Sequence, residues 1–365
     1  MIEQGKISYK QLISMIVMTI SPTAILYLPT ITYKEAKQDG WISILIVTIY
    51  AFLVAYIIIN LNKMFEGKTI IQYSGKIVGK YFGKVIGFLY CVLYIHLNAT
   101  VIREFSEVLA GPFMPETPLL FFTIGIMLPS MYGVYKGIEV IARTAQIIFP
   151  IFLGAVIIII LLGISDMDFS RLQPILAEGY EPVLKGASRQ ISWFSQTIIL
   201  TIITPFTNLP KKIGKMTYIA VILVSIMIIL VNISIVATFG GEVELMNYPF
   251  LSFARYISAI GSLERLDSII MFLWIGGVFI KIVILHYCGV IAISQLFSVK
   301  DYRIFSIPVG IILIILSNIL WGSLTELKES IKMINVPYNT MVQAGIPTVL
   351  IIIEKIKRRF VHNEK

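Results

Sequence analysis

Ten apolar runs dominate this 365-residue chain, and each is close to the roughly 20 residues that an α-helix needs to cross a bilayer. The runs cover about residues 10–33, 42–62, 82–107, 118–136, 141–164, 188–207, 214–239, 267–296, 305–323 and 334–354. Hydrophobic residues make up 57% of the chain against 14% charged, which is more apolar surface than one soluble core can hide. The sequence therefore predicts an all-α polytopic membrane protein with ten transmembrane helices.

Lysine and arginine residues concentrate in alternate segments between these runs, and both chain ends belong to the basic set. By the positive-inside bias, this distribution predicts that both termini lie in the cytoplasm. The net charge of +9 is therefore attributed to membrane orientation and contact with membrane lipids, and no nucleic-acid partner is expected. We expect a single integral membrane domain over 1–365 that ends in a basic cytoplasmic tail at 355–365.

Two of the runs are interrupted at corresponding places. The first contains Ser21-Pro22-Thr23, and the sixth contains Ser192, Ser195, Gln196 and Thr197 before Pro205. A proline inside a helix leaves carbonyl groups without their usual donors, and such groups must meet protein, water or ligand. Transporters made of two inverted repeats bind their substrate where helices of each half are broken. The sequence thus predicts a five-plus-five arrangement, with repeat one at about 9–164 and repeat two at about 188–354.

The candidate ligand contacts are residues of the first, third and sixth runs that offer polar side chains or exposed backbone. They are Ser21, Pro22, Thr23, Ala24, Asn98, Trp193, Ser195 and Gln196. Each has an alternative interpretation, because Pro22 could make an ordinary kink and the polar side chains could hydrogen-bond between helices. The two interruptions taken together favour a central ligand cavity.

Lys281 lies in the middle of FLWIGGVFIKIVILHYCGVIAI, residues 272–293 of the eighth run, and this stretch contains no acidic residue. A charge at the bilayer centre costs about 2.5 to 3.5 kcal/mol on insertion scales, so it should face a protein interior or a wet cavity. Gly277, one helical turn away, permits close approach of a neighbouring helix. The alternative is a lysine that snorkels along a wet crevice.

Other polar patterns predict structure rather than chemistry. The segment 75–87, GKIVGKYFGKVIG, predicts one helix with a glycine packing stripe beside lysines that contact anionic lipid headgroups. Arg103, Glu104 and Glu107 end the third run and are expected to form a solvated rim. His96 and His286 lack the spacing of a helical metal site, and no HExxH or nucleophile-base pattern occurs. We expect no metal, no cofactor and no enzymatic activity.

Several segments resemble one known family along nearly the whole chain. They are TAILYLP at 23–29, RLQPILAEGYEPVLKGA at 171–187, PKKIGK at 210–215, NYPFLSFARYIS at 247–258 and LERLDSIIMFLWIGGVFIKI at 263–282. The chain resembles the spore germination permeases, the B subunits of GerA-type nutrient germinant receptors. The resemblance implies the LeuT-like fold of the amino acid, polyamine and organocation transporter superfamily, with broken helices 1 and 6. It also implies that a small nutrient, an amino acid or a nucleoside, binds in the central cavity.

The same resemblance implies assembly with an A subunit and a lipoprotein C subunit in the spore inner membrane, where nutrient binding starts germination. A proton-coupled or facilitative amino acid transporter is one alternative, and an ion or water channel component that binds no nutrient is another. The uptake of labelled amino acid by the protein alone separates the first alternative from a sensor.

The resemblance also suggests a role for Lys281. Sodium-coupled relatives of this fold bind a cation between the first and eighth helices, so we hypothesise that the Lys281 ammonium fills that place and donates to carbonyls at residues 18–21. The first-helix break of the superfamily is usually glycine-rich, whereas Ser21-Pro22-Thr23-Ala24 stand here. Whether an amino acid carboxylate binds in the usual way or a different nutrient is recognised therefore stays open.

Overall fold

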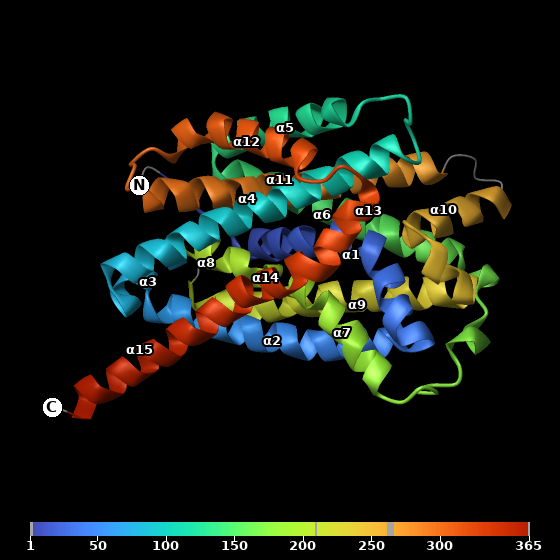
Figure 1. Ribbon diagram of the computed structural model, residues 1–365, viewed down its shortest axis with the longest axis horizontal. Helices are drawn as coiled ribbons and strands as arrows, with labels where there is room; N and C mark the ends of the chain where they lie inside the picture. Colours follow the sequence, from blue (N-terminus) through green and yellow to red (C-terminus); the bar gives the residue numbers. More distant parts are fainter. Residues whose placement is uncertain (1–2, 209, 261–265, 364–365) are drawn as a thin grey trace.

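The computed structural model describes residues 3–208, 210–260 and 266–363. Residues 263–265 of the LERLDS segment and residues 364–365 of the predicted basic tail lie outside these ranges. Within them the secondary structure is helical, apart from one isolated bridge between Ile7 and Thr207. The long helices lie side by side in one bundle (Figure 1).

The helices of the first part of the chain are α1 (Tyr9–Ala36), α2 (Gly40–Met64), α3 (Ile70–Val78), α4 (Lys80–Ala110), α5 (Leu119–Lys136) and α6 (Ile138–Leu162). Those of the second part are α7 (Glu181–Phe194), α8 (Leu200–Ile203), α9 (Ile213–Phe239), α10 (Pro249–Ile260), α11 (Leu266–Leu296), α12 (Ser306–Ile319), α13 (Leu324–Ser330), α14 (Val336–Thr340) and α15 (Ile346–Asn363). A 3-10 segment, Ser195–Ile199, joins α7 to α8, and π-helical segments, Ile331–Asn335 and Met341–Gly345, flank α14.

Eight stretches of the described chain are long and apolar enough to cross a membrane. One of them, Tyr9–Met64, is 56 residues long and holds both α1 and α2. The sixth predicted span is not among them, because α7 ends at Phe194 and 3-10 turns follow. The chain is an all-α integral membrane protein as predicted, while the count of ten spans stays a prediction.

The peripheral helices expose apolar side chains, as helices in contact with lipid do. Ile49 of α2, Ile147 of α6 and Ile307 of α12 are 63%, 66% and 60% exposed. The helix α1 is buried along most of its length, and Lys281 on α11 is completely buried. The centre of the bundle is therefore formed by the buried parts of α1 and α11.

The two predicted interruptions take different forms. The helix α1 is continuous from Tyr9 to Ala36 with Pro22 inside it, and Figure 1 shows it changing direction along its length. The interruption at residues 21–24 is thus a kink rather than an unwound segment, because a proline ring removes one N–H and displaces the preceding turn. In the sixth run, the α-helix gives way to 3-10 turns at Ser195, within the predicted interruption.

The N-terminal segment closes one end of the bundle, which we call the N-terminal end. The Ile7 N–H donates to the Phe206 carbonyl (2.8 Å), and the Ile7 carbonyl accepts from the Asn208 N–H (3.0 Å). The Glu3 carboxylate accepts from the Tyr302 hydroxyl (2.7 Å) and from the Ile138 N–H (3.2 Å). The first residues are therefore bonded to segments from both parts of the chain.

The prediction of one helix with a glycine stripe over residues 75–87 is wrong, because the chain turns back at Gly79. This glycine has φ 87°, which other residues rarely adopt, and it separates α3 from α4. A Cβ on Gly83 would lie 2.3 Å from the Gly75 Cα, whereas a Cβ on Gly75 would meet nothing within 4 Å. The glycines do permit close backbone packing, but between two successive helices.

We expect Gly83→Ala to destabilise the protein and Gly75→Ala to leave it unchanged or slightly more stable. A methyl group on Gly83 must push α3 and α4 apart, and overpacking of this kind costs about 1–3 kcal/mol. Thermal unfolding of both variants in the same detergent measures the difference. Equal unfolding temperatures would contradict this crossing of α3 and α4.

Candidate functional site

Lys281 meets α1 at the kink. Its ammonium donates to the Thr23 hydroxyl at 2.7 Å, and the whole side chain is inaccessible to solvent. The predicted pairing of the eighth run with the first-run interruption is thus found between α11 and α1. The predicted acceptors were wrong, because the Thr23 side chain, rather than a carbonyl of residues 18–21, receives the ammonium.

Two more contacts fix α11 against the kink. The Trp274 indole N–H donates to the Pro22 carbonyl at 2.8 Å, which gives a partner to a carbonyl at the kink. A Cβ on Gly277 would lie 3.1 Å from the Pro22 ring, so the glycine allows the close approach that its position predicted. Residues 274, 277 and 281 lie on one face of α11, which therefore packs along the bend of α1.

A small cavity of about 20 Å³ lies beside this contact, between α1, α4, α7 and α11. It is lined by Thr23, Leu97, Thr100, Val101, Glu104, Ser192, Trp193, Gln196, Lys281, Ile331 and Asn339. Its volume suits about one water molecule. Of the predicted site residues, the structure brings Thr23, Trp193, Gln196 and Lys281 together here.

The other predicted residues are buried nearby but do not line this cavity. The Asn98 amide donates to the Ile282 carbonyl (3.2 Å), and the Ser195 hydroxyl bonds the Tyr50 hydroxyl (3.1 Å). Both contacts join different helices, which is the alternative that the sequence left open for polar residues in membrane helices. Ser21, Pro22 and Ala24 are buried in α1.

Glu104 contradicts its prediction as part of a solvated rim. Only 3% of the residue is exposed, and it lines the cavity that contains Lys281. The helix α4 continues to Ala110, so Glu104 lies more than a turn before its end. Its spacing of seven, four and three residues from Leu97, Thr100 and Val101 puts all four on one face, and this was the signal available in the sequence.

Arg103 and Glu107 were also wrongly assigned to a solvated rim. The Arg103 Nη2 lies 2.7 Å from the Glu107 carboxylate, and the two side chains are only 5% and 15% exposed. The pair satisfies both charges within α4, and Arg103 also donates to the Ser317 carbonyl at 3.4 Å. It therefore holds α4 to α12 and leaves the Glu104 carboxylate free to face the cavity.

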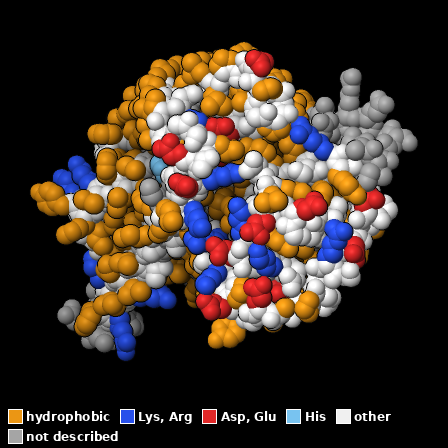
Figure 2. Space-filling model, turned by 45° about the vertical axis from the view of Figure 1, so that its right-hand side comes forward, with side chains coloured by type: hydrophobic (Ala, Val, Ile, Leu, Met, Phe, Trp, Pro, Cys, Tyr) orange, Lys and Arg blue, Asp and Glu red, His pale blue; other side chains and the backbone are white. Residues whose placement is uncertain are grey.

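A larger hollow of about 210 Å³, which we call the vestibule, opens at the end of the bundle away from Glu3. Glu104, Trp193 and Ile331 line both the vestibule and the small cavity, so these three side chains separate the two spaces. Figure 2 shows this face, where basic and acidic side chains gather around a depression. The small cavity is therefore closed from this side by side chains alone.

Charged residues of the vestibule are partly paired. Arg189 lies 3.0 Å from Glu35, and Lys328 donates to the Asn247 side chain at 2.5 Å. Burial and the nearby Lys34 ammonium lower the pKa of Lys328. Four basic and three acidic side chains line the vestibule, so its charge is nearly balanced.

Two side chains that line the small cavity have an amide oxygen that accepts no hydrogen bond. The amide oxygens of Gln196 and Asn339 are buried without a partner. Buried polar atoms nearly always have a partner, so each such oxygen marks a place where a donor is expected. Together with Glu104 these oxygens favour a ligand with N–H groups, while the Lys281 ammonium favours a ligand with an acceptor or a negative charge.

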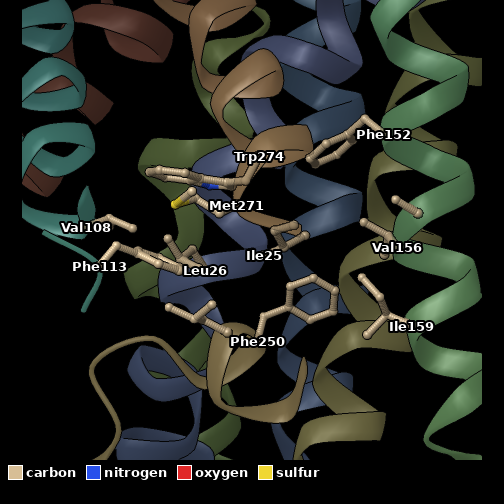
Figure 3. Close-up of a pocket in the computed structure, with 12 residues that line it drawn as sticks. Ile25, Leu26, Val108, Phe113, Phe152, Val156, Ile159, Phe250, Met271 and Trp274 are labelled. Carbon is tan, nitrogen blue, oxygen red and sulfur yellow. The ribbon is translucent and has the colours of Figure 1, made fainter. Parts of the chain in front are cut away.

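An apolar pocket of about 30 Å³ lies on the other side of Trp274, and its sides come from α1, α6, α10 and α11. Figure 3 shows Ile25, Trp274, Phe152 and Phe250 around it. Its lining contains no charged side chain, and the Trp274 N–H is already bonded to Pro22. The pocket is a packing void without groups that could recognise a polar molecule.

The two membrane histidines occupy structural positions. The His286 Nε2 donates to the Ser306 carbonyl (3.0 Å), so its Nδ1 accepts from the Ser130 hydroxyl (3.0 Å). His96 packs against the rings of Trp321 and Tyr338. Among residues 3–208, 210–260 and 266–363, no group of three or more His, Cys, Asp or Glu side chains is arranged to hold a metal ion.

A family model described as "Spore germination protein" matches residues 6–320. The chain belongs to this family. It is 27% identical to spore germination protein KB of Bacillus subtilis over 98% of this chain and 96% of that protein. It is 28% identical to spore germination protein YndE of the same organism over 81% of this chain and 82% of that protein. The family resemblance of the sequence is thereby confirmed, and the family is not one of enzymes.

Two solved structures share the fold of this germination-family chain. A substrate-bound, outward-open Na⁺-coupled sialic acid symporter superposes with a TM-score of 0.67, at 13% identity, over 91% of this chain and 77% of the symporter. MhsT in complex with L-phenylalanine superposes with a TM-score of 0.69, also at 13% identity, over 93% of this chain and 89% of MhsT. The predicted LeuT-like fold is thereby confirmed.

Proposed function

We propose that this chain is the B subunit of a spore nutrient germinant receptor and binds a small germinant in the central cavity. The observation that carries the proposal is the combination of Lys281, Glu104 and the unpartnered amide oxygens of Gln196 and Asn339 in one buried space. An amino acid zwitterion offers a carboxylate for the lysine and an ammonium for the other three groups. A nucleoside is the alternative germinant, since it offers hydroxyl and amino groups.

The cavity must enlarge when the germinant enters, because it now has room for about one water molecule. Trp193 and Ile331 are the side chains that move in this proposal, since they separate the cavity from the vestibule. The germinant favours the enlarged state by no more than its difference in affinity for the two states. Partner A and C subunits convert this shift into the start of germination.

The predicted residues have two roles in this proposal. Thr23, Trp193, Gln196 and Lys281 contact the germinant or its immediate surroundings. Ser21, Pro22, Ala24, Asn98, Ser195 and Gly277 shape the kink of α1 and hold the neighbouring helices in register. We place the chain in the spore inner membrane because of its family, as one domain of two repeats. The distribution of basic residues supports placing both termini on the core side.

A proton-coupled or facilitative amino acid transporter is the second candidate function. The likeness in fold to a symporter and to MhsT supports it. Uptake of labelled amino acid into liposomes that contain only this chain would favour transport, whereas binding without uptake would favour a sensor.

Substitutions of two glutamines that lie six residues apart, Gln190 and Gln196, test the binding site. Gln196 lines the cavity and Gln190 does not, although both are buried and each has an amide oxygen without a partner. We expect one amino acid from a panel of amino acids and nucleosides to raise the unfolding temperature of the purified protein. Its affinity should fall at least about tenfold in Gln196→Met, which corresponds to one lost hydrogen bond to a charged group.

The control variant Gln190→Met should bind that amino acid as tightly as the unchanged protein does. The cavity assignment is wrong if the two variants lose affinity equally. The germinant proposal fails if no amino acid or nucleoside stabilises the receptor, including when A and C subunits are present.

A further inference from the structure

A lysine-rich groove runs between α2 and α9 at the N-terminal end of the bundle. It has a volume of about 440 Å³. Tyr56, Ile59 and Lys63 contribute from α2, and Lys215, Tyr218 and Ile222 contribute from α9. Each set recurs every three or four residues, so the groove is formed by two facing helix stripes. It lies outside the central cavity and the vestibule.

The two ends of this groove differ in chemistry. Lys63 at the end of α2 and Lys211 and Lys215 around the start of α9 form its basic end. Tyr56 and Ile222 form the other end and are 53% and 44% exposed on the membrane-facing side of the bundle. Lys63 and Tyr56 are seven helical residues apart, which is about 10 Å. A charged end and an apolar end at this separation match a lipid headgroup and the first part of its acyl chain.

The basic end has no compensating charge of its own. None of its three lysines has a hydrogen-bond or ion-pair partner in the described chain, and no described carboxylate lines the groove. An uncompensated basic pocket between transmembrane helices attracts anionic lipid headgroups. A zwitterionic headgroup would bring its own cation toward these lysines and is disfavoured.

A second pocket of about 220 Å³ continues the groove toward the N-terminal segment and shares Lys63 with it. Asn62 lines this pocket, donates to the Leu200 carbonyl (3.2 Å) and keeps a buried amide oxygen without a partner. Lys68 lies here too, and the adjacent Lys76 ammonium lowers the pKa of Lys68. Three ammonium groups, those of Lys6, Lys63 and Lys68, line the pocket against one carboxylate, that of Glu66, so positive charge is in excess. The Asn62 amide oxygen adds an acceptor for a hydroxyl group.

We propose that this groove is a binding site for an anionic glycerophospholipid with a hydroxyl-bearing headgroup, taken from the leaflet at the N-terminal end. The phosphate binds between Lys63, Lys211 and Lys215, and a headgroup hydroxyl donates to the Asn62 amide oxygen. An acyl chain follows Tyr56 and Ile222 toward the middle of the membrane. The site goes beyond the proposed germinant function and does not depend on it.

The test compares two double variants of the full-length protein that remove equal charge at the same end. Lys211→Gln with Lys215→Gln removes lysines of the groove, whereas Lys136→Gln with Lys300→Gln removes exposed lysines outside it at the same end. Phosphatidylglycerol, added to the protein in neutral detergent, should raise the unfolding temperature, and phosphatidylcholine should not. The affinity for phosphatidylglycerol should fall about 10-fold or more in the groove variant, as expected for the loss of two charges near a membrane surface.

Three outcomes would overturn the proposal. Equal losses in the two double variants would show attraction by general surface charge. Stabilisation by inorganic phosphate alone, equal to that by the lipid, would show a small-anion site. Equal stabilisation by phosphatidylcholine would show that charge plays no part.

A further variant, Ile222→Asn, keeps every lysine and alters a half-exposed apolar position. It should weaken the binding of phosphatidylglycerol and keep the unfolding temperature of the lipid-free protein. Unchanged lipid binding in this variant would exclude the acyl-chain path.

Discussion

Replacing Lys281 with methionine should abolish the response of spores to their germinant and lower the stability of the protein by about 1–3 kcal/mol, the cost typical of leaving a buried polar group without its partner. The ammonium bonds Thr23 and lines the same buried cavity as Glu104. Its loss leaves the Glu104 carboxylate in that cavity without an opposite charge. Thermal unfolding of the purified protein and germination of spores that carry the variant measure the two effects.

The double variant Lys281→Met with Glu104→Gln is the control, because it removes both charges. It should recover part of the stability lost in Lys281→Met but not the germinant response. A third variant, Thr23→Val, keeps the charge and the shape and should cost about 1.5–3 kcal/mol for one lost hydrogen bond to a charged group. Normal stability and a normal response in Lys281→Met would show that the buried charge is dispensable.

Replacing Trp193 with alanine should join the vestibule to the central cavity. The indole is 5% exposed and, with Glu104 and Ile331, forms the barrier between the two spaces. A cysteine introduced by Thr100→Cys lies in the cavity and can report its accessibility. A water-soluble maleimide should label this cysteine at least about tenfold faster when Trp193→Ala is also present. With Trp193 in place, the reagent can reach the cavity only in a minor open conformation of the protein. The native Cys91 and Cys288 are buried and give a low background.

The conservative variant Trp193→Phe keeps a large ring and should leave the labelling rate of Thr100→Cys nearly unchanged. In spores, Trp193→Ala should also require a higher germinant concentration, since the enlarged cavity holds the germinant less closely. A labelling rate that is the same in both variants would show that Trp193 does not separate the cavity from the vestibule.

The cost of exposing polar groups to lipid was sufficient to predict the membrane fold and the burial of Lys281, whereas the pairing of Lys281 with α1 was suggested by the family resemblance. A lone ammonium in a 31-residue apolar helix must find a partner, and the kink at Pro22 was the place with polar groups to offer. The change to 3-10 turns at Ser195 was likewise marked by polar residues inside an apolar run.

The remaining members of the site depend on tertiary packing that no local pattern contains. The apolar run ends near Glu104, which therefore resembled a residue at the solvated rim. In the structure α4 continues to Ala110, and the Glu104 side chain is buried. Ile331 and Asn339 reach the cavity from π-helical and short helical segments near the chain end, a region without a distinct sequence signal. Asn98 and Ser195 had the expected polar character but found partners on neighbouring helices.

The pairing of Ile7 with Phe206 and Asn208 makes the two chain ends unequal as attachment points for reporters. A fluorescent protein or a purification tag joined ahead of Glu3 would be attached directly to the segment that closes the N-terminal end. We expect such a fusion to weaken the hydrogen bonds of Glu3 and Ile7. The helix α15 extends away from the bundle toward the C-terminus (Figure 1), and the hydrogen bonds of Glu3 and Ile7 that close the N-terminal end do not involve it. C-terminal labels are therefore better suited to imaging studies of the resting protein. An N-terminal fusion can instead be used to weaken the packing at the N-terminal end on purpose.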